Sequence, residues 1–354
     1  MLSANESPIV TESGTSRESG IISGDTPSPQ LFPVLQNGRI GFINRQGEVV
    51  LSPQFCLNLN GRFRVLAALT ARGAAASLFP VETAGLWGYM NHSGVMTIDP
   101  DFEEAGSFSE GMAPVKISGK WGFINPGGRV AINPQFDDAG AFNEGFASVK
   151  VDDKWGFINH DGSYLVRPQF DDLTGRRWST LDVASNHGHF SGGFAGAKVN
   201  DKWGYIDRTG TFVILPQYDN AQSFFDGLAG IQVDGKWGFI REDGSIAVNP
   251  QFEDAGGFGN KLAPAKVSDG WGYIDTAGSW VANPQFEDAY SFFHEVAAAK
   301  SSGKWGYVDA TCNYTITPRF DEAGDFQGDL APVRLSEGWG YIDRKGVYVW
   351  APTN

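Results

Sequence analysis

The chain has 354 residues, a formal net charge of −14 at pH 7, 46 glycines and 13% aromatic residues. This acidic balance argues against sequence-independent binding to nucleic acid, because phosphate neutralisation needs clustered Lys and Arg. No stretch has the length of an apolar membrane span, and no basic start followed by an apolar run marks a secretory signal. Cys56 and Cys312 lie far apart, which does not suggest a disulfide framework. We therefore expect a protein of a reducing, cytoplasmic compartment with no membrane span.

Residues 1–30 are rich in Ser, Thr, Gly, Glu and Pro and contain few large apolar groups. Such a segment buries too little surface to offset the entropy of ordering, so we expect a disordered N-terminal tail. From residue 31 to residue 354 the chain repeats itself, and repeats decide the architecture before any other pattern.

The repeat has two independent markers. The first is a Trp-Gly dipeptide whose spacing is 34 residues in six of seven intervals, at Trp87, Trp121, Trp155, Trp203, Trp237, Trp271, Trp305 and Trp339. Ile40-Gly41 is a degenerate ninth copy. The second is a proline 13 residues after each of these nine positions, from Pro53 to Pro352. The sequence therefore predicts nine copies of one module.

Residues 113–145 show how one module reads. Residues 113–117 alternate apolar and polar side chains, which is typical of a strand, and Ser118-Gly119 turns the chain. Residues 120–125 carry apolar groups on both faces and predict a second strand that is buried on both sides. We expect the glycine after Trp121 to leave room for a neighbouring module. A four-residue turn ending in glycine and a third short strand follow, which gives a β-meander of about 22 residues and a connector of about 12.

The first and last copies are atypical, with Ile40 in place of Trp and Trp350 in place of an aliphatic residue. Atypical ends are expected of capping repeats in an open array. We therefore favour an all-β array of hairpins in an open solenoid or superhelix, with a closed toroid or propeller-like ring as the alternative. One turn also departs from the pattern: Cys312 replaces the fourth-position glycine, where we expect a left-handed backbone.

The motifs Lys-Trp-Gly-Phe-Ile-Asn and Lys-Trp-Gly-Tyr-Ile-Asp, with the downstream Gly and Pro-Gln-Phe, resemble the WG repeat family of bacterial proteins. The resemblance covers residues 31–354. It implies a β-repeat fold used for interaction and supplies no shared catalytic residues. A weaker similarity, limited to an aromatic hairpin that ends in Asn-x-x-Gly, is to choline-binding cell-wall repeats.

An acidic pair recurs in most modules, as in Asp137-Asp138 and Glu253-Asp254. Stacked pairs could form a ladder that binds Ca²⁺, but no Gly-rich calcium nonapeptide accompanies them. Paired carboxylates are also typical of enzymes that hydrolyse glycosides. Such catalysis requires one pair whose two carboxyl groups differ, and not many equivalent pairs. We expect these groups to cap turns and to face the periodic lysines, and we expect no cofactor, no metal and no enzymatic activity.

Two insertions interrupt the period, near 58–73 and 173–189. Arg and Trp are enriched at interaction hot spots, so the insertions supply the candidate partner-binding residues: Arg62, Phe63, Arg64, Arg176, Arg177, Trp178, His187 and His189. The two histidines could also be half of a metal site. Neutral surface loops are the alternative, because extending a loop costs little free energy.

The Trp series could stack on sugars or choline-like cations, although its mid-strand position favours a structural repeat core. Our leading hypothesis is a non-catalytic scaffold that presents a repeated β-surface to a protein partner. A carbohydrate or cell-envelope binding module is the alternative, with a glycan as the ligand. A hydrolase that uses paired carboxylates is the third reading.

Overall fold

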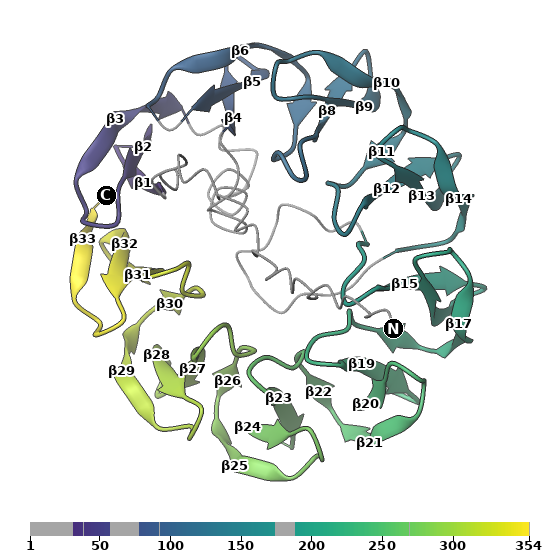
Figure 1. Ribbon diagram of the computed structural model, residues 1–354. Coiled ribbons are helices and arrows are strands. Elements are labelled where there is room, and N and C mark those ends of the chain that lie inside the picture. The colour runs from purple at the N-terminus through teal and green to yellow at the C-terminus, as the bar shows by residue number, and fades with distance from the viewer. Residues whose placement is uncertain are drawn as a thin grey trace, which may run out of the picture.

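The computed structural model describes residues 31–37, 39–56, 78–91, 93–173, 188–268 and 270–353. These residues form nine small antiparallel sheets, or blades, that follow one another around a ring (Figure 1). The protein is a nine-bladed β-propeller, and the all-β repeat fold is confirmed. The proposed tail 1–30, the whole of the first insertion and most of the second lie outside the described residues.

Each blade uses the meander that the sequence predicts, and six blades add a two-residue inner strand from the connector. The inner strands are β7 (Glu104–Ala105), β11 (Asp138–Ala139), β18 (Asn220–Ala221), β22 (Asp254–Ala255), β26 (Asp288–Ala289) and β30 (Glu322–Ala323). The strand that follows this position is called the second strand in all nine blades, including the three without a described inner strand. The second strands are β1 (Phe32–Gln36), β4 (Leu78–Thr83), β8 (Ala113–Ile117), β12 (Phe146–Val151), β15 (Phe194–Val199), β19 (Leu228–Val233), β23 (Leu262–Val267), β27 (Val296–Ser301) and β31 (Leu330–Leu335).

In every blade the Trp-Gly strand lies between the second strand and the proline strand, and the proline strand lies outermost (Figure 1). The Trp-Gly strands are β2 (Arg39–Ile43), β5 (Leu86–Asn91), β9 (Lys120–Ile124), β13 (Lys154–Asn159), β16 (Lys202–Asp207), β20 (Lys236–Arg241), β24 (Gly270–Asp275), β28 (Lys304–Asp309) and β32 (Gly338–Asp343). The outer strands are β3 (Val49–Cys56), β6 (Met96–Phe102), β10 (Val130–Phe136), β14 (Tyr164–Phe170), β17 (Phe212–Tyr218), β21 (Ile246–Phe252), β25 (Trp280–Phe286), β29 (Tyr314–Phe320) and β33 (Tyr348–Thr353).

The ring closes where the first blade packs against the ninth (Figure 1). Phe32, Val34 and Ile43 of blade 1 share a buried cluster with Leu330 and Tyr341 of blade 9. Closure uses side-chain packing and no exchanged strand among the described residues, as the intact first and last modules indicate. The open superhelix that we favoured is therefore wrong and the closed ring, its alternative, is correct. The atypical first and last modules meet each other instead of capping two free ends.

The outer strand explains both the repeated proline and the repeated glycine. Proline lacks an N–H group, so at a sheet edge it limits pairing with another chain. The outer strand also bulges over the Trp-Gly strand, and a Cβ added to Gly122 would lie 2.6 Å from the Ile132 carbonyl oxygen and 2.7 Å from Pro134 N. The close approach therefore comes from the blade's own outer strand. Our expectation of a neighbouring module at this glycine is wrong.

Neighbouring blades meet through two repeated contacts. In the first, an aliphatic side chain of one outer strand packs on the turn glycine of the next blade; a Cβ on Gly244 would lie 3.4 Å from Ile214 Cγ1. In the second, the aromatic residue two positions after a Trp packs on a Phe in the next connector at seven junctions, as for Phe123 and Phe142 at 5.1 Å between ring centroids. Such edge or tilted aromatic pairs add to the free energy gained from area burial.

Cys312 occupies the turn position of these glycines. Its φ of 62° is the left-handed conformation that the sequence predicts there. Its side chain is only 7% exposed and shares a buried cluster with Ala282, which stands where six other outer strands carry Ile or Val. A larger turn residue therefore faces a smaller outer-strand residue, so the two changes compensate in volume.

Candidate interaction surface

The Trp residues of the repeat lie mainly in the core. Trp155, Trp203, Trp237, Trp271 and Trp305 are buried, and Trp87, Trp121 and Trp339 are half-buried. The aromatic rings available at the surface are therefore mostly others.

The repeated acidic pairs form local contacts with turns and lysines. The first acidic residue of a pair binds the lysine before the Trp, as in Lys202 Nζ to Asp219 Oδ1 at 2.6 Å, and also accepts the backbone N–H of the hairpin turn at Asp234. The lysine contact comes first among the causes that lower the pKa of Asp219. The second acidic residue caps its own connector, as Asp138 does toward Ala139 N at 2.8 Å. Within the described ranges, no cluster of three or more His, Cys, Asp or Glu side chains is placed to hold a metal ion.

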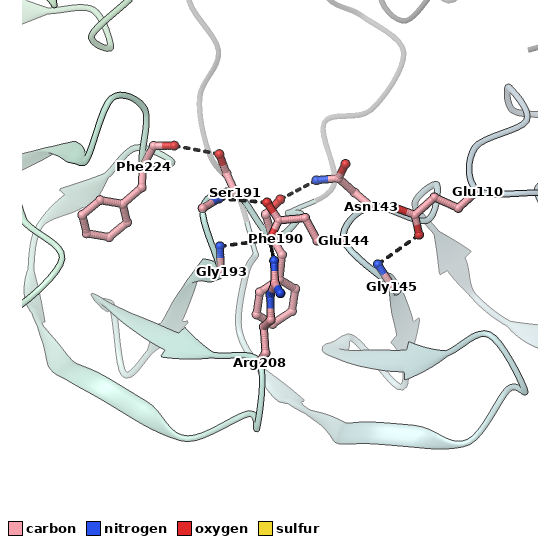
Figure 2. A network of polar contacts seen from close by, with 10 residues as sticks. Glu110, Asn143, Glu144, Gly145, Phe190, Ser191, Gly193, Arg208 and Phe224 are labelled. Atoms are coloured by element: carbon pink, nitrogen blue, oxygen red, sulfur yellow. Dashed lines mark hydrogen bonds and ion pairs between the residues drawn. The ribbon is translucent and has the colours of Figure 1, made fainter. Parts of the chain in front are cut away.

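The connector turns that precede the second strands are linked from blade to blade (Figure 2). Glu144 of one turn accepts hydrogen bonds from the backbone N–H groups of Gly192 and Gly193, both at 2.9 Å, and from Arg208 at 2.8 Å. Burial raises the pKa of Glu144, but the hydrogen bonds from Arg208, Gly193 and Gly192 outweigh it, so its pKa is lowered. The carboxylate is thus held ionised in a structural role.

Further contacts extend this chain of turns (Figure 2). Glu110 accepts the N–H of Gly145 at 3.0 Å, and Ser191 donates to the Phe224 carbonyl oxygen at 2.7 Å. Asn143 donates to the Phe190 carbonyl oxygen. These side chains connect adjacent blades, and no signal in the sequence distinguishes them from other polar turn residues.

The structure describes one of the eight predicted partner-binding residues. Arg62, Phe63, Arg64, Arg176, Arg177, Trp178 and His187 lie outside the described residues. His189 is described; it is partly exposed and comes directly before Phe190, which is fully buried. The second insertion therefore ends at the network of Figure 2.

The exposed large apolar side chains of the described residues mark the outer rim of the ring. Ten of the eleven lie on outer strands or immediately before them: Val49, Val50, Val95, Val130, Val213, Leu215, Ile246, Val281, Val347 and Tyr348. The most exposed is Leu215 on β17, at 69%, and Val213 on the same strand is 46% exposed. The corresponding pair on β29 is Thr315 and Thr317. Blade 5 thus presents an apolar edge where blade 8 presents a polar one.

A second aromatic series lies beside this rim. Tyr164, Phe212, Trp280, Tyr314 and Tyr348 are partly exposed, and each packs edge-to-face on the last Phe of the preceding outer strand. These aromatic residues recur at one position of the sequence repeat, but their place near the outer rim follows only from the ring structure.

The comparison with protein families agrees with the repeat. The model for the WG containing repeat matches nine segments, at residues 40–55, 87–121, 121–155, 155–175, 188–203, 203–237, 237–270, 271–305 and 305–337. The chain belongs to the WG repeat family. These matches cover more than half of the chain, so the resemblance found in the motifs is confirmed. No curated protein sequence matches it.

The WG repeat chain is also similar to solved structures. One is described as the crystal structure of the eukaryotic initiation factor: the TM-score is 0.58 at 11% identity, over 91% of this chain and 95% of that one. Another is Hsv2p of Kluyveromyces lactis, with a TM-score of 0.42 at 9% identity over 68% and 93% of the two chains. Dihydro-heme d1 dehydrogenase NirN has a TM-score of 0.47 at 12% identity over 79% and 74%. At these identities the first likeness concerns the fold alone.

No helix among the described residues is long and apolar enough to cross a membrane.

Proposed function

We propose that this WG repeat protein is a non-catalytic, cytoplasmic scaffold that binds a protein partner through the outer rim of its ring. The observation that carries the proposal is the concentration of exposed apolar side chains on the outer strands. Contiguous exposed apolar groups favour burial against another protein. The rim prolines limit strand pairing along the same edges, so recognition by side chains is favoured over addition of a strand.

The absence of enzymatic activity is part of the proposal. The carboxylates that could act as general acids or bases cap turns and bind lysines in equivalent ways in several blades. A catalytic pair requires two carboxyl groups whose environments differ, because one must be protonated when the other is ionised. The repeated contacts favour a structural role.

The test uses β17 and a matched position on β29. We expect the full chain carrying Leu215→Asp to lose partner proteins that the unmodified chain captures, while Thr317→Asp at the corresponding position of blade 8 retains them. Both residues are on outer strands, so effects on stability should be small and similar. Equal capture by both variants would contradict a rim site at blade 5.

Carbohydrate binding is the second candidate, and the half-exposed aromatic series favours it. Rings such as Trp280 and Tyr314 recur at one position of successive outer strands, as rows of sugar-stacking residues do. A glycan array with the full chain tests this reading. Binding that is lost in Trp280→Ala and retained in Leu215→Asp would assign the rim to a glycan.

A further inference from the structure

The junction between blade 9 and blade 1, the seam, is built differently from seven of the other junctions. In those seven the Phe in the connector packs on the preceding blade's Trp-Gly strand, with ring centroids 4.8–5.1 Å apart. The second strands of the blades that follow carry Ala at the position of Phe32, as at Ala331. At the seam Phe32 itself packs on Tyr341, at 5.6 Å. Phe32 therefore fills, from β1, a space that a connector Phe fills at those seven junctions; at the junction of blades 1 and 2, Phe79 of β4 likewise packs on Phe42, at 6.3 Å.

The seam also leaves a buried hydroxyl without an acceptor. Four tyrosines at the position of Tyr341 donate to an inner-strand or connector carbonyl oxygen of the next blade, at 2.7–2.9 Å: Tyr89, Tyr205, Tyr273 and Tyr307. Tyr341 is 3% exposed, and its hydroxyl has no hydrogen-bond partner among the described residues. The indole N–H of Trp350 in the same seam is likewise buried and unpartnered there. Two buried donors thus lack acceptors, which costs free energy.

The backbone of β1 shows where the missing acceptor belongs. In blade 4 the inner strand and its flanking residues pair with β12 through Asp137 N to Lys150 O at 2.8 Å and Gly140 N to Ser148 O at 2.9 Å. The same strand positions in β1 are Leu35 and Pro33. Among the described residues β1 has β2 as its one strand partner, so no described strand covers its inner edge, where the Pro33 and Leu35 carbonyl groups lie.

We propose that the inner edge of β1 is a docking site for an extended peptide segment of a partner protein, which adds to blade 1 as its fourth, innermost strand. The segment donates backbone N–H groups to the Pro33 and Leu35 carbonyl oxygens, and its own carbonyl oxygen accepts the Tyr341 hydroxyl. This mode is β-strand addition, in which main-chain hydrogen bonds supply affinity and side chains supply specificity.

The resident inner strands define the chemistry of the segment. Four of them read acidic-Ala-Gly with the glycine just after the strand, at Gly106, Gly140, Gly256 and Gly324. Small residues are required because a Cβ on Gly106 would lie 2.7 Å from Pro114 Cγ, and Pro33 occupies the same position in β1. An aromatic residue is not required, since Phe32 already contacts Tyr341. The partner segment is thus extended, acidic and rich in Ala and Gly.

This site is separate from the rim, so its test does not depend on the proposed function. The probe is an acetylated peptide that copies residues 137–141, Asp-Asp-Ala-Gly-Ala, titrated into the full chain labelled for NMR. We expect saturable shifts at the Leu35 amide and the Tyr341 ring. A peptide with proline at its glycine lacks the N–H for Pro33 and should bind about tenfold more weakly. Shifts spread over all blades, or equal binding of both peptides, would overturn the proposal.

Two tyrosine variants provide the matched comparison. Tyr341→Phe should weaken the peptide about three- to tenfold, the equivalent of one hydrogen bond, while leaving the unfolding temperature of the free protein unchanged or higher. Tyr307→Phe removes a hydroxyl that is already bonded to Gly324 O, so it should lower the unfolding temperature and leave peptide affinity unchanged. The reverse pattern, or no difference between the two variants, would refute a site at Tyr341.

A designed exchange adds a third readout. Replacing Phe32 with Ala gives β1 the residue found in seven other blades. In that variant a longer peptide that ends in Phe, copying residues 137–142, should bind more tightly than the five-residue peptide. In the unmodified chain the added Phe should give no gain. A gain in the unmodified chain would show that Phe32 does not occupy the aromatic position.

Discussion

The contact between Cys312 and Ala282 provides a quantitative test of blade packing. Cys312→Gly relieves a left-handed backbone that costs a non-glycine residue about 1–2 kcal/mol. The same change removes a buried side chain worth about 1–2 kcal/mol and leaves a cavity beside Ala282. The two effects nearly cancel, so the single variant should unfold within about 1 kcal/mol of the unmodified protein. Stabilisation by glycine alone, which the turn pattern suggests, is not expected.

The effect of Ala282→Val on the free energy of unfolding should change sign with the residue at position 312. Ala282→Val alone adds two methyl groups against Cys312 and should destabilise by about 1–3 kcal/mol. In the double variant the introduced valine would face a glycine turn, as Val248 faces Gly278. The two added methyl groups then contribute about 1.6 kcal/mol, so the double variant should be at least as stable as the unmodified protein. The predicted coupling free energy is at least about 2 kcal/mol.

The assay is equilibrium unfolding in guanidinium chloride for all four proteins, followed by tryptophan fluorescence and circular dichroism. Gly278→Cys is the control for an uncompensated turn side chain, because a Cβ there would lie 2.8 Å from Val248 Cγ1. It should destabilise by more than about 2 kcal/mol. Additive effects of Ala282→Val and Cys312→Gly, within about 0.5 kcal/mol, would refute the compensation.

Three further results are expected. Trp237→Ala should cost about 3–5 kcal/mol in the same unfolding assay, because this ring is buried; a loss below about 1 kcal/mol would place the ring at the surface. Burial raises the pKa values of the tyrosines at the blade junctions above 10. The stability that these tyrosines contribute is therefore present below pH 10 and is lost as the pH rises further. Tyrosinate absorbance and circular dichroism should change together, and unfolding at a lower pH than tyrosine ionisation would contradict this prediction. Replacing Arg62, Arg64, Arg176, Arg177 and Trp178 with Ala should weaken partner capture with little change in the unfolding midpoint, and full-strength capture would remove both insertions as a binding site.

The contents of a module could be read from the sequence because its signals are local. Period-2 alternation marks the strands around Trp121, and the turn glycines mark positive φ, as Gly128 at 75° shows. Even the strain at Cys312 followed from its place in the turn. The inner strands were missed, since two residues such as Asp138 and Ala139 are too short to show any periodicity.

The candidate site was less accessible to sequence reasoning. The insertions stood out because they break the period, but the exposed pair Val213 and Leu215 looks like ordinary strand residues until the outer edge is known. The unpartnered hydroxyl of Tyr341 is a still weaker signal in the sequence. The Tyr307 hydroxyl donates to the Gly324 carbonyl oxygen of the next blade, whereas the Tyr341 hydroxyl has no acceptor among the described residues.

The sequence by itself determined the repeat, the number of modules, the all-β class and the backbone conformation of the turns. These features depend on hydrophobic alternation and glycine conformation, which act within a few residues. Tertiary structure alone decided that nine blades close into a ring. Closure depends on the small rotation between successive blades, which arises from side-chain volumes at each junction, such as Ile214 on Gly244. The rotations between successive blades add up around the ring until Phe32 of blade 1 packs on Tyr341 of blade 9. A pattern of a few residues does not predict this total rotation.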